Sequence, residues 1–154
     1  MKARTIALVV ALCFVSVAIY ATSDPQLATW KLNEGKSQIA PGTTKNTTVT
    51  YEAAGDSVKV TVDGTTADGK PSHNEWTGKF DGKDYPVTGD PSSDMRSYKK
   101  VDNNTLDLTV KKDGKATITG KIVISADGKV RTVTVNGTDA SGKKYKTVAV
   151  YDKQ

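Results

Sequence analysis

Residues 105–153 read TLDLTVKKDGKATITGKIVISADGKVRTVTVNGTDASGKKYKTVAVYDK, and this stretch decides the fold. Apolar and polar residues alternate along it, so that Leu106, Leu108 and Val110 fall on one face of an extended chain. Such alternation, rich in Val, Ile and Thr, is typical of β-strands that bury one face. No segment after residue 23 keeps a helical spacing of apolar residues over three turns. The pattern therefore predicts long strands and very little helix.

The tripeptide Asp-Gly-Lys separates these runs and occurs four times, with glycines Gly69, Gly82, Gly114 and Gly128. The spacing from Gly114 to Gly128 is 14 residues, and Gly142 follows after another 14. Asp-Gly suits the type I′ turn of a two-residue hairpin, which needs positive φ at both central residues. We interpret the four glycines as structural residues of type I′ hairpin turns, and not as parts of a metal or phosphate site.

The same pattern predicts ten strands in the whole chain. We expect them at about 28–33, 47–54, 57–66, 74–80, 84–88, 95–101, 105–112, 115–125, 130–139 and 143–152. Long strands joined by short turns form a meander, and closure into a barrel protects its edges completely. We predict an all-β fold, an antiparallel up-and-down barrel of about eight to ten strands. The alternative is a two-sheet β-sandwich, whose crossovers need more chain than these turns offer.

The N-terminal residues 1–23 have the order of a secretory signal peptide. Lys2 and Arg4 precede an uncharged, mostly apolar run, and small residues follow it. The run of about 15 residues is shorter than the ~20 that a membrane-spanning helix needs. Cys13, the only cysteine, lies inside it. We therefore expect residues 24–154 to form one exported barrel domain without a disulfide or membrane anchor, in the periplasm or outside a bacterium.

The distribution of charges argues against nucleic-acid binding. Lys and Arg number 22 against 17 Asp and Glu, and the two signs are interleaved without a long basic run. A nucleic-acid-binding protein concentrates its basic residues on one face. The sequence thus predicts no nucleic-acid partner.

The opening ATWKLN (28–33) and the ending Val150-Tyr151-Asp152-Lys153 resemble those of the calycin superfamily, the lipocalins and fatty-acid-binding proteins. The whole is most similar to secreted lipocalin-like proteins of bacteria. This resemblance implies a barrel with an internal cavity, in which Trp30 plugs the closed end. The chain also departs from the pattern, because Ala149 stands where fatty-acid-binding proteins hold the ligand carboxylate with an Arg, and the helical lid is absent. The resemblance does not support fatty-acid binding by that mechanism.

Five residues are our candidates for the wall of a ligand site: Trp76, Tyr85, Arg96, Tyr98 and Arg131. Tyrosine and tryptophan offer apolar area with one polar group, which suits an amphipathic ligand. An inward Arg would hold an anionic head group, because its planar fork fits a carboxylate. An outward Arg96 is the simpler expectation, whereas Arg131 alternates in register with two valines. The sequence leaves the direction of both arginines open.

Catalysis and metal binding have weaker support. His73 is the only histidine, and no G-x-S-x-G motif or acidic cluster accompanies it. Asp90 and Asp94 lack the dense oxygen ligands of a calcium loop. We predict no catalytic residue, no metal and no cofactor.

The predicted function is that of a secreted, non-catalytic binding protein holding a small apolar or amphipathic ligand inside the barrel. The alternative is an envelope or extracellular protein-interaction or inhibitor module with a filled barrel. A minor alternative is a haem protein or enzyme that uses His73.

Overall fold

The computed structural model describes residues 24–139 and 141–154. The predicted signal peptide and Cys13 lie outside these residues. The described chain forms ten strands: β1 (Thr29–Leu32), β2 (Lys45–Ala54), β3 (Ser57–Thr65), β4 (Pro71–Gly78), β5 (Tyr85–Thr88), β6 (Met95–Lys100), β7 (Thr105–Lys112), β8 (Lys115–Ile124), β9 (Val130–Thr138) and β10 (Lys144–Lys153). Each lies within a few residues of a predicted strand, because the alternating pattern and the turn residues coincide at most strand ends.

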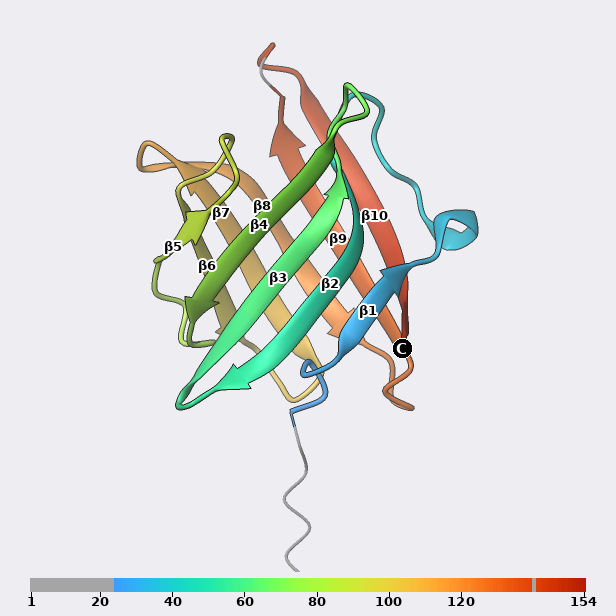
Figure 1. The fold of residues 1–154 in the computed structure, drawn as a ribbon, viewed down its shortest axis with the longest axis vertical. Coiled ribbons are helices and arrows are strands. Elements are labelled where there is room, and N and C mark those ends of the chain that lie inside the picture. The colour runs from blue at the N-terminus through green and yellow to red at the C-terminus, as the bar shows by residue number, and fades with distance from the viewer. Residues whose placement is uncertain (1–23, 140) are drawn as a thin grey trace, which may run out of the picture.

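The strands form one closed antiparallel barrel, in which each pairs with its neighbours in sequence and β1 closes onto β10 (Figure 1). The seam pairs Trp30 with Lys153 and Leu32 with Tyr151. On its other side β1 pairs with β2, where Trp30 lies opposite Val49. The predicted up-and-down barrel is therefore confirmed, and the sandwich alternative is wrong.

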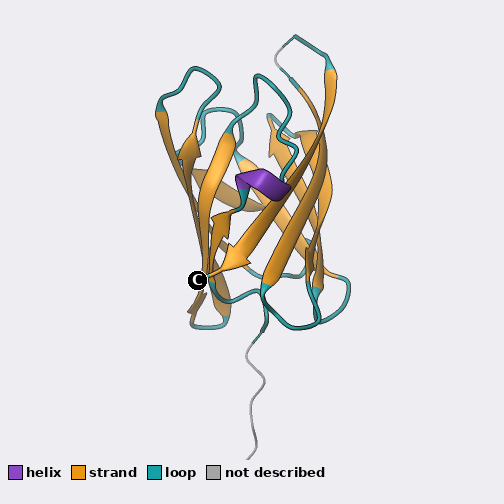
Figure 2. Cartoon of the chain, turned by 90° about the vertical axis from the view of Figure 1, so that its right-hand side faces the viewer, coloured by secondary structure: helices purple, strands orange, loops and turns teal. Residues whose placement is uncertain are grey.

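A single helical turn interrupts the β-structure of the described residues. This 3-10 helix, η1 (Glu34–Lys36), lies in the β1–β2 connection, where the Asn33 side chain caps it. It lies along the side of the barrel and not across an end (Figure 2). The loop after it is held to β10 by the bridge between Gln38 and Val148. In the described part of the chain, no helix is long and apolar enough to span a bilayer.

The turns follow a different geometry from the one predicted. All four Asp-Gly-Lys glycines have positive φ, between 71° and 82°. However, Asp113 is the only non-glycine residue with positive φ in the described chain, so only the β7–β8 turn meets the type I′ requirement. In the β3–β4 and β8–β9 loops a hydroxyl residue, Thr66 or Ser125, accepts a backbone bond from the glycine three positions on. These are longer loops in which the glycine alone is left-handed.

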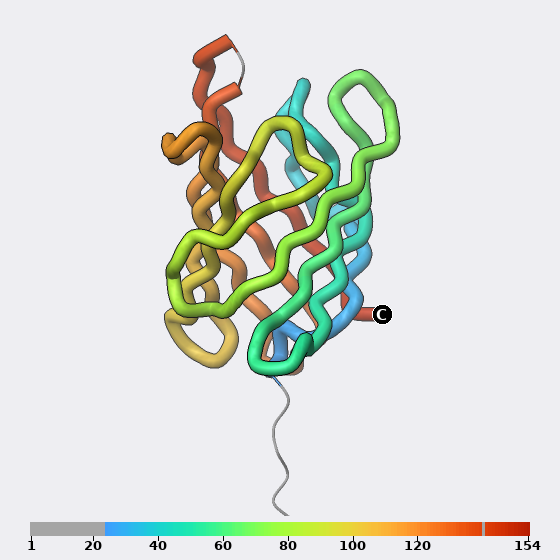
Figure 3. The backbone as a smooth tube through the Cα atoms, turned by 60° about the vertical axis from the view of Figure 1, so that its left-hand side comes forward, coloured from blue at the N-terminus to red at the C-terminus, as the bar shows by residue number. Residues whose placement is uncertain are grey.

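The prediction was also wrong for Gly82, which lies outside any tight hairpin. Its N–H donates to the carbonyl of Tyr98, so the β4–β5 connection lies along β6. This connection and the β5–β6 loop lie in front of the other strands in Figure 3, coloured from light green to yellow. β5 makes only two residue pairs with each of its neighbours.

One end of the barrel is closed by the residues that precede β1. The side-chain amide of Gln26 donates to the carbonyl of Asn104, and Lys100 forms an ion pair with Asp24. Trp30 is completely buried, and its indole N–H donates to the Gln26 carbonyl at 3.1 Å. The N-terminal segment is thus tied to the β6–β7 turn across this end.

Candidate functional site: the barrel interior

Aromatic rings fill one side of the interior. Trp76 on β4 makes an edge contact with Tyr98 on β6 at 4.7 Å between centroids, and it stacks parallel to Phe80 at 6.5 Å. Tyr51 on β2 contacts Tyr98 at 6.1 Å. Edge-to-face and offset arrangements at these distances add to the stabilisation from burial. We call this side the aromatic wall; it comprises Tyr51, Trp76, Phe80, Tyr85 and Tyr98.

Hydrogen bonds and a glycine fix the positions of the aromatic wall. The Trp76 indole donates to the carbonyl of Arg96 at 2.8 Å. Tyr85 is half-buried, its hydroxyl donates to Asp81, and its ring contacts Trp76 edge-on at 5.7 Å. A Cβ atom at Gly78 would collide with the Tyr85 and Trp76 rings, so the glycine makes room for them. Trp76, Tyr85 and Tyr98 therefore form one contiguous surface.

The opposite side of the interior, from β7 to β10, is less completely covered. Leu106, Ile122 and Ile124 near the closed end are fully buried. Further along the same inward faces Val110 is buried, but several other apolar side chains stay half-buried although the barrel is closed. We call this side the open wall; it comprises Leu108, Ile118, Val133, Val135 and Tyr145. Two glycines, Gly120 and Gly137, share its faces and add no side chain to the interior.

Arg131 extends from β9 across the interior to β2. Its Nη2 donates to the Tyr51 hydroxyl at 2.7 Å. The guanidinium lies over the Tyr51 ring at 5.0 Å and the Tyr151 ring at 5.2 Å. The residue is 3% exposed, and its Nε has no hydrogen-bond partner among the described residues. Each cation–π contact contributes about 0.5–2 kcal/mol, whereas burying an ionised group costs several kcal/mol.

Arg96 also faces the interior, contrary to the simpler expectation of a surface charge. It is 7% exposed, and its Nη2 donates to the Asn74 side-chain oxygen at 3.1 Å. Burial disfavours an ionised Asp90, but hydroxyl bonds from Ser92 and Ser93 and the charge of Arg96 keep the pKa of Asp90 below its usual value. Arg96 therefore has a carboxylate within electrostatic range.

The two arginines are the buried cations of the described chain, and neither forms an ion pair. Every ion pair within 4.0 Å uses a lysine or His73, and none uses either arginine. Burial raises the pKa of Tyr51 and of Tyr151, and Arg131 opposes both shifts. Both tyrosines consequently stay neutral at physiological pH and do not neutralise the guanidinium.

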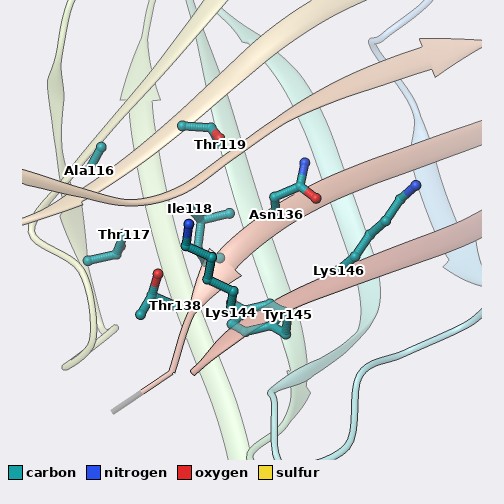
Figure 4. A pocket seen from close by; sticks show the side chains of 10 residues that line it. Ala116, Thr117, Ile118, Thr119, Asn136, Thr138, Lys144, Tyr145 and Lys146 are labelled. Atoms are coloured by element: carbon teal, nitrogen blue, oxygen red, sulfur yellow. The ribbon is translucent and has the colours of Figure 1, made fainter. Parts of the chain in front are cut away.

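Two hollows lie on the β8–β10 side. The first, of about 520 Å³, is surrounded by side chains from all three strands, with Ile118 and Tyr145 of the open wall among them (Figure 4). The second, of about 720 Å³, adjoins it at Asn136 and follows the outer face of β8 and β9. Val123, 40% exposed, lies in this second hollow. None of the five predicted wall residues lines either hollow.

His73 lies on the outer face of the barrel, away from the aromatic wall. It is exposed, and its Nδ1 lies 2.7 Å from Asp63 Oδ1. Glu75, 3.9 Å from its other ring nitrogen, is held by Lys59 at 2.7 Å. The described residues contain no group of three His, Cys, Asp or Glu side chains that would hold a metal.

Sequence reasoning missed several interior residues. Tyr51, Tyr151 and Asn74 are not among the five predicted wall residues. Tyr51 alternates with Val49, and Tyr151 with Ala149, so their inward direction could have been read from period two. The contact between Arg131 and Tyr51 joins residues 80 positions apart, and no local pattern indicates it.

Comparison with known proteins adds little beyond the fold. No protein-family model matches the chain, and no curated protein does. Among solved structures, the chain is similar to one described as EF1p2_mFAP2b bound to DFHBI, with 12% identity and a TM-score of 0.48 over 84% of this chain and 94% of that one. It is also similar to a redesigned β-barrel, mFAP1, bound to DFHBI, with 16% identity and a TM-score of 0.44 over 84% and 95%. The closed ten-stranded barrel fits the fold that the calycin resemblance implies.

Proposed function

We propose that this protein is an exported, non-catalytic, lipocalin-like binding protein that holds a small apolar or amphipathic molecule inside its barrel. One observation carries the proposal: Leu108, Ile118, Val133 and Val135 face inward in a closed barrel and yet stay half-buried. Apolar surface left accessible inside a concave site favours a ligand that removes it from water. The aromatic wall opposite supplies a rigid second surface.

The ligand would lie between the two walls. Trp76 and Tyr98 are locked by their mutual contact and by the bond to the Arg96 carbonyl, so they need no reordering on binding. Binding would cover the exposed parts of the open wall. Export rests on the signal-like pattern of residues 1–23.

Titration with N-phenyl-1-naphthylamine, a neutral dye whose emission rises in apolar surroundings, tests this proposal. We expect saturable binding with one site per chain. Leu108→Trp should abolish it, because the larger ring occupies the space beside the open wall. Thr109→Trp is the matched control, since the next residue of β7 faces outward and should leave binding unchanged. Binding that survives Leu108→Trp, or no saturable binding by the native chain, refutes an interior site.

A second candidate function has one observation in its favour. The outer hollow of about 720 Å³ contains the exposed Val123, and such exposed apolar surface is typical of protein interfaces. A partner docked there should be lost from pull-downs with Val123→Asp and retained with Leu108→Trp. The opposite result would assign the partner to the interior.

A further inference from the structure

We propose that Asp113 is a site of spontaneous covalent modification, at which the backbone rearranges to isoaspartate through a cyclic succinimide. This inference does not depend on the proposed function. In the first step the backbone nitrogen of Gly114 attacks the side-chain carboxyl carbon of Asp113. A C–N bond forms, the carboxyl C–OH bond breaks, and the hydroxyl leaves as water with the amide proton of Gly114. Water then opens the ring, and opening at the backbone carbonyl leaves the chain connected through the side chain of Asp113.

Four positions share the same local chemistry. Asp-Gly-Lys occurs at residues 68–70, 81–83, 113–115 and 127–129. In each, the glycine after the aspartate has no Cβ atom to crowd the attacking nitrogen. Local sequence alone therefore predicts equal reactivity at the four positions, and any difference between them comes from the folded structure.

At three of these positions hydrogen bonds hold both reacting groups. The glycine N–H groups donate to backbone carbonyls: Gly69 to Thr66, Gly82 to Tyr98 and Gly128 to Ser125. The carboxylates accept from nearby donors: Asp68 from Thr66 and Lys70, Asp81 from Lys83 and Tyr85, and Asp127 from Ser125 and Lys129. Both groups must be released from these partners before the ring can close.

The same hydrogen bonds keep the three carboxylates ionised. They lower the pKa of each, chiefly through the Lys70 side chain at Asp68, the Lys83 backbone at Asp81 and the Ser125 side chain at Asp127. Ring closure starts from the neutral acid, whose hydroxyl leaves as water. A lowered pKa makes that form scarcer and slows the reaction.

Neither reacting group is held at the fourth position. Among the described residues, the Gly114 N–H donates to no acceptor, and the Asp113 carboxylate accepts no hydrogen bond and forms no ion pair. Both residues are exposed at the tip of the β7–β8 turn. Asp113 also has a φ of 49°, in a region that non-glycine residues seldom adopt. Isoaspartate places one more atom in the backbone and is not confined to that conformation.

Two further pairs with the right sequence lie inside paired strands. Asp63-Gly64 belongs to β3, where Gly64 pairs with β2 on one side and β4 on the other. Asn136-Gly137 belongs to β9, where Gly137 pairs with β8 and β10. A strand paired on both sides cannot bend its backbone nitrogen toward its own side chain without breaking the ladder. The folded chain thus leaves Asp113 as the reactive position.

Incubation of the native chain at mildly acidic pH, followed by chymotryptic digestion and electron-transfer fragmentation, locates isoaspartate at individual positions. We expect at least fivefold more isoaspartate at Asp113 than at Asp68, Asp81 or Asp127. The matched control is the same chain in denaturant, where the four positions should react within about twofold of one another. Equal reaction at the four positions of the native chain, or more at any other position than at Asp113, would overturn the proposal. So would a native chain without isoaspartate after the time in which the denatured chain reacts.

Two asparagine variants give a second measurement at matched positions. Asp113→Asn and Asp127→Asn each close the same ring with release of ammonia, and hydrolysis then raises the mass of the chain. We expect the mass of Asp113→Asn to rise at least fivefold faster than that of Asp127→Asn, because the Gly128 N–H stays bonded to the Ser125 carbonyl. Intact-protein mass spectrometry follows both, with the native chain as the background. Equal rates, or a faster rise in Asp127→Asn, would contradict the assignment.

Discussion

The aromatic wall and the open wall of the barrel are built from the same alternating pattern, and they differ in what the inward positions carry. Strands β2, β4, β5 and β6 each place an aromatic ring inward, and the rings contact one another across the interior. Strands β7 to β9 place mainly branched aliphatic residues and two glycines inward, and β10 adds Tyr145 at the same end. Several of these side chains stay half-buried. The difference teaches that strand pairing and interior filling are separate properties, since one can be complete while the other is not.

Truncation of one side chain in each wall should show the difference in packing between the two walls most clearly. Trp76→Ala removes a fully buried ring and its hydrogen bond, and we expect a loss of about 3–5 kcal/mol in unfolding free energy. Leu108→Ala should cost only about 1–2 kcal/mol, because part of this side chain is already exposed. Guanidinium unfolding followed by circular dichroism measures both. Equal losses would mean that the two walls are packed alike.

Adding one methyl group in each wall should give a smaller difference in unfolding free energy between the walls. A Cβ at Gly78 would collide with the Tyr85 and Trp76 rings, and one at Gly137 would collide with the Tyr145 ring. Gly78→Ala should cost about 1–3 kcal/mol, since its neighbours are locked in the aromatic wall. Gly137→Ala should cost less, because the half-buried Tyr145 can swing aside. The order of the two unfolding midpoints checks this, and a larger loss at Gly137 would reverse our view of the open wall.

Alkaline pH should act through the buried tyrosines. Burial raises the pKa of Tyr51 in the folded chain, so the folded state keeps a proton that the unfolded state loses above about pH 10. The stabilisation is complete below the unfolded pKa and is lost as pH rises, by about 1.4 kcal/mol per pH unit for each such tyrosine. Tyr51→Phe should remove one proton's share, about 1.4 kcal/mol per pH unit, from the decrease in unfolding free energy with pH. Unfolding titrations at several alkaline pH values measure this slope. An unchanged slope would mean that this hydroxyl ionises in the folded barrel.

Substitutions on the outer faces of the two walls should differ least in their effect on stability. Lys59 pairs with Glu75 outside the aromatic wall, and Lys121 pairs with Asp107 outside the open wall, both with exposed side chains. Exposed pairs contribute little and are screened by salt. Lys59→Met and Lys121→Met should each shift the unfolding midpoint less than any interior variant above, and the shifts should shrink further in high salt. A large shift in either would show that the outer face takes part in packing.

The sequence predicted the strands well because their signals are local. Alternation marks each strand, and a glycine near most turns marks its end, so a window of about ten residues suffices. The same locality explains the error in the turns. Asp-Gly favours a type I′ turn in isolation, but the hydroxyls of Thr66 and Ser125 cap a longer loop with the glycine as its last residue. The Asp113 turn has no such hydroxyl and keeps the predicted geometry.

The candidate site was harder to predict because its properties depend on distant partners. Trp76 and Tyr98 were selected for their chemistry, and their contact depends on the register of β4 to β6. The sequence could not settle the direction of Arg96, since one arginine between a methionine and a serine has no neighbouring pattern to follow. The contacts of the Arg131 guanidinium depend on which side chains reach it from β2 and β10, and these are set only by the closed barrel.

The seam between β1 and β10 has a consequence for the order of assembly. Every other pair of strands joins neighbours in the chain, whereas this one brings Asn33 beside Asp152, 119 positions later. Eight of the ten strand pairings can form before β10 is made, whereas the β9–β10 pairing and the β1–β10 seam both need the last strand. Until then the meander has two unpaired edges and an exposed Trp30 strand, the form that any chaperone meets. Because the chain is synthesised from its N-terminus, β1 cannot complete its pairing until β10 has been made.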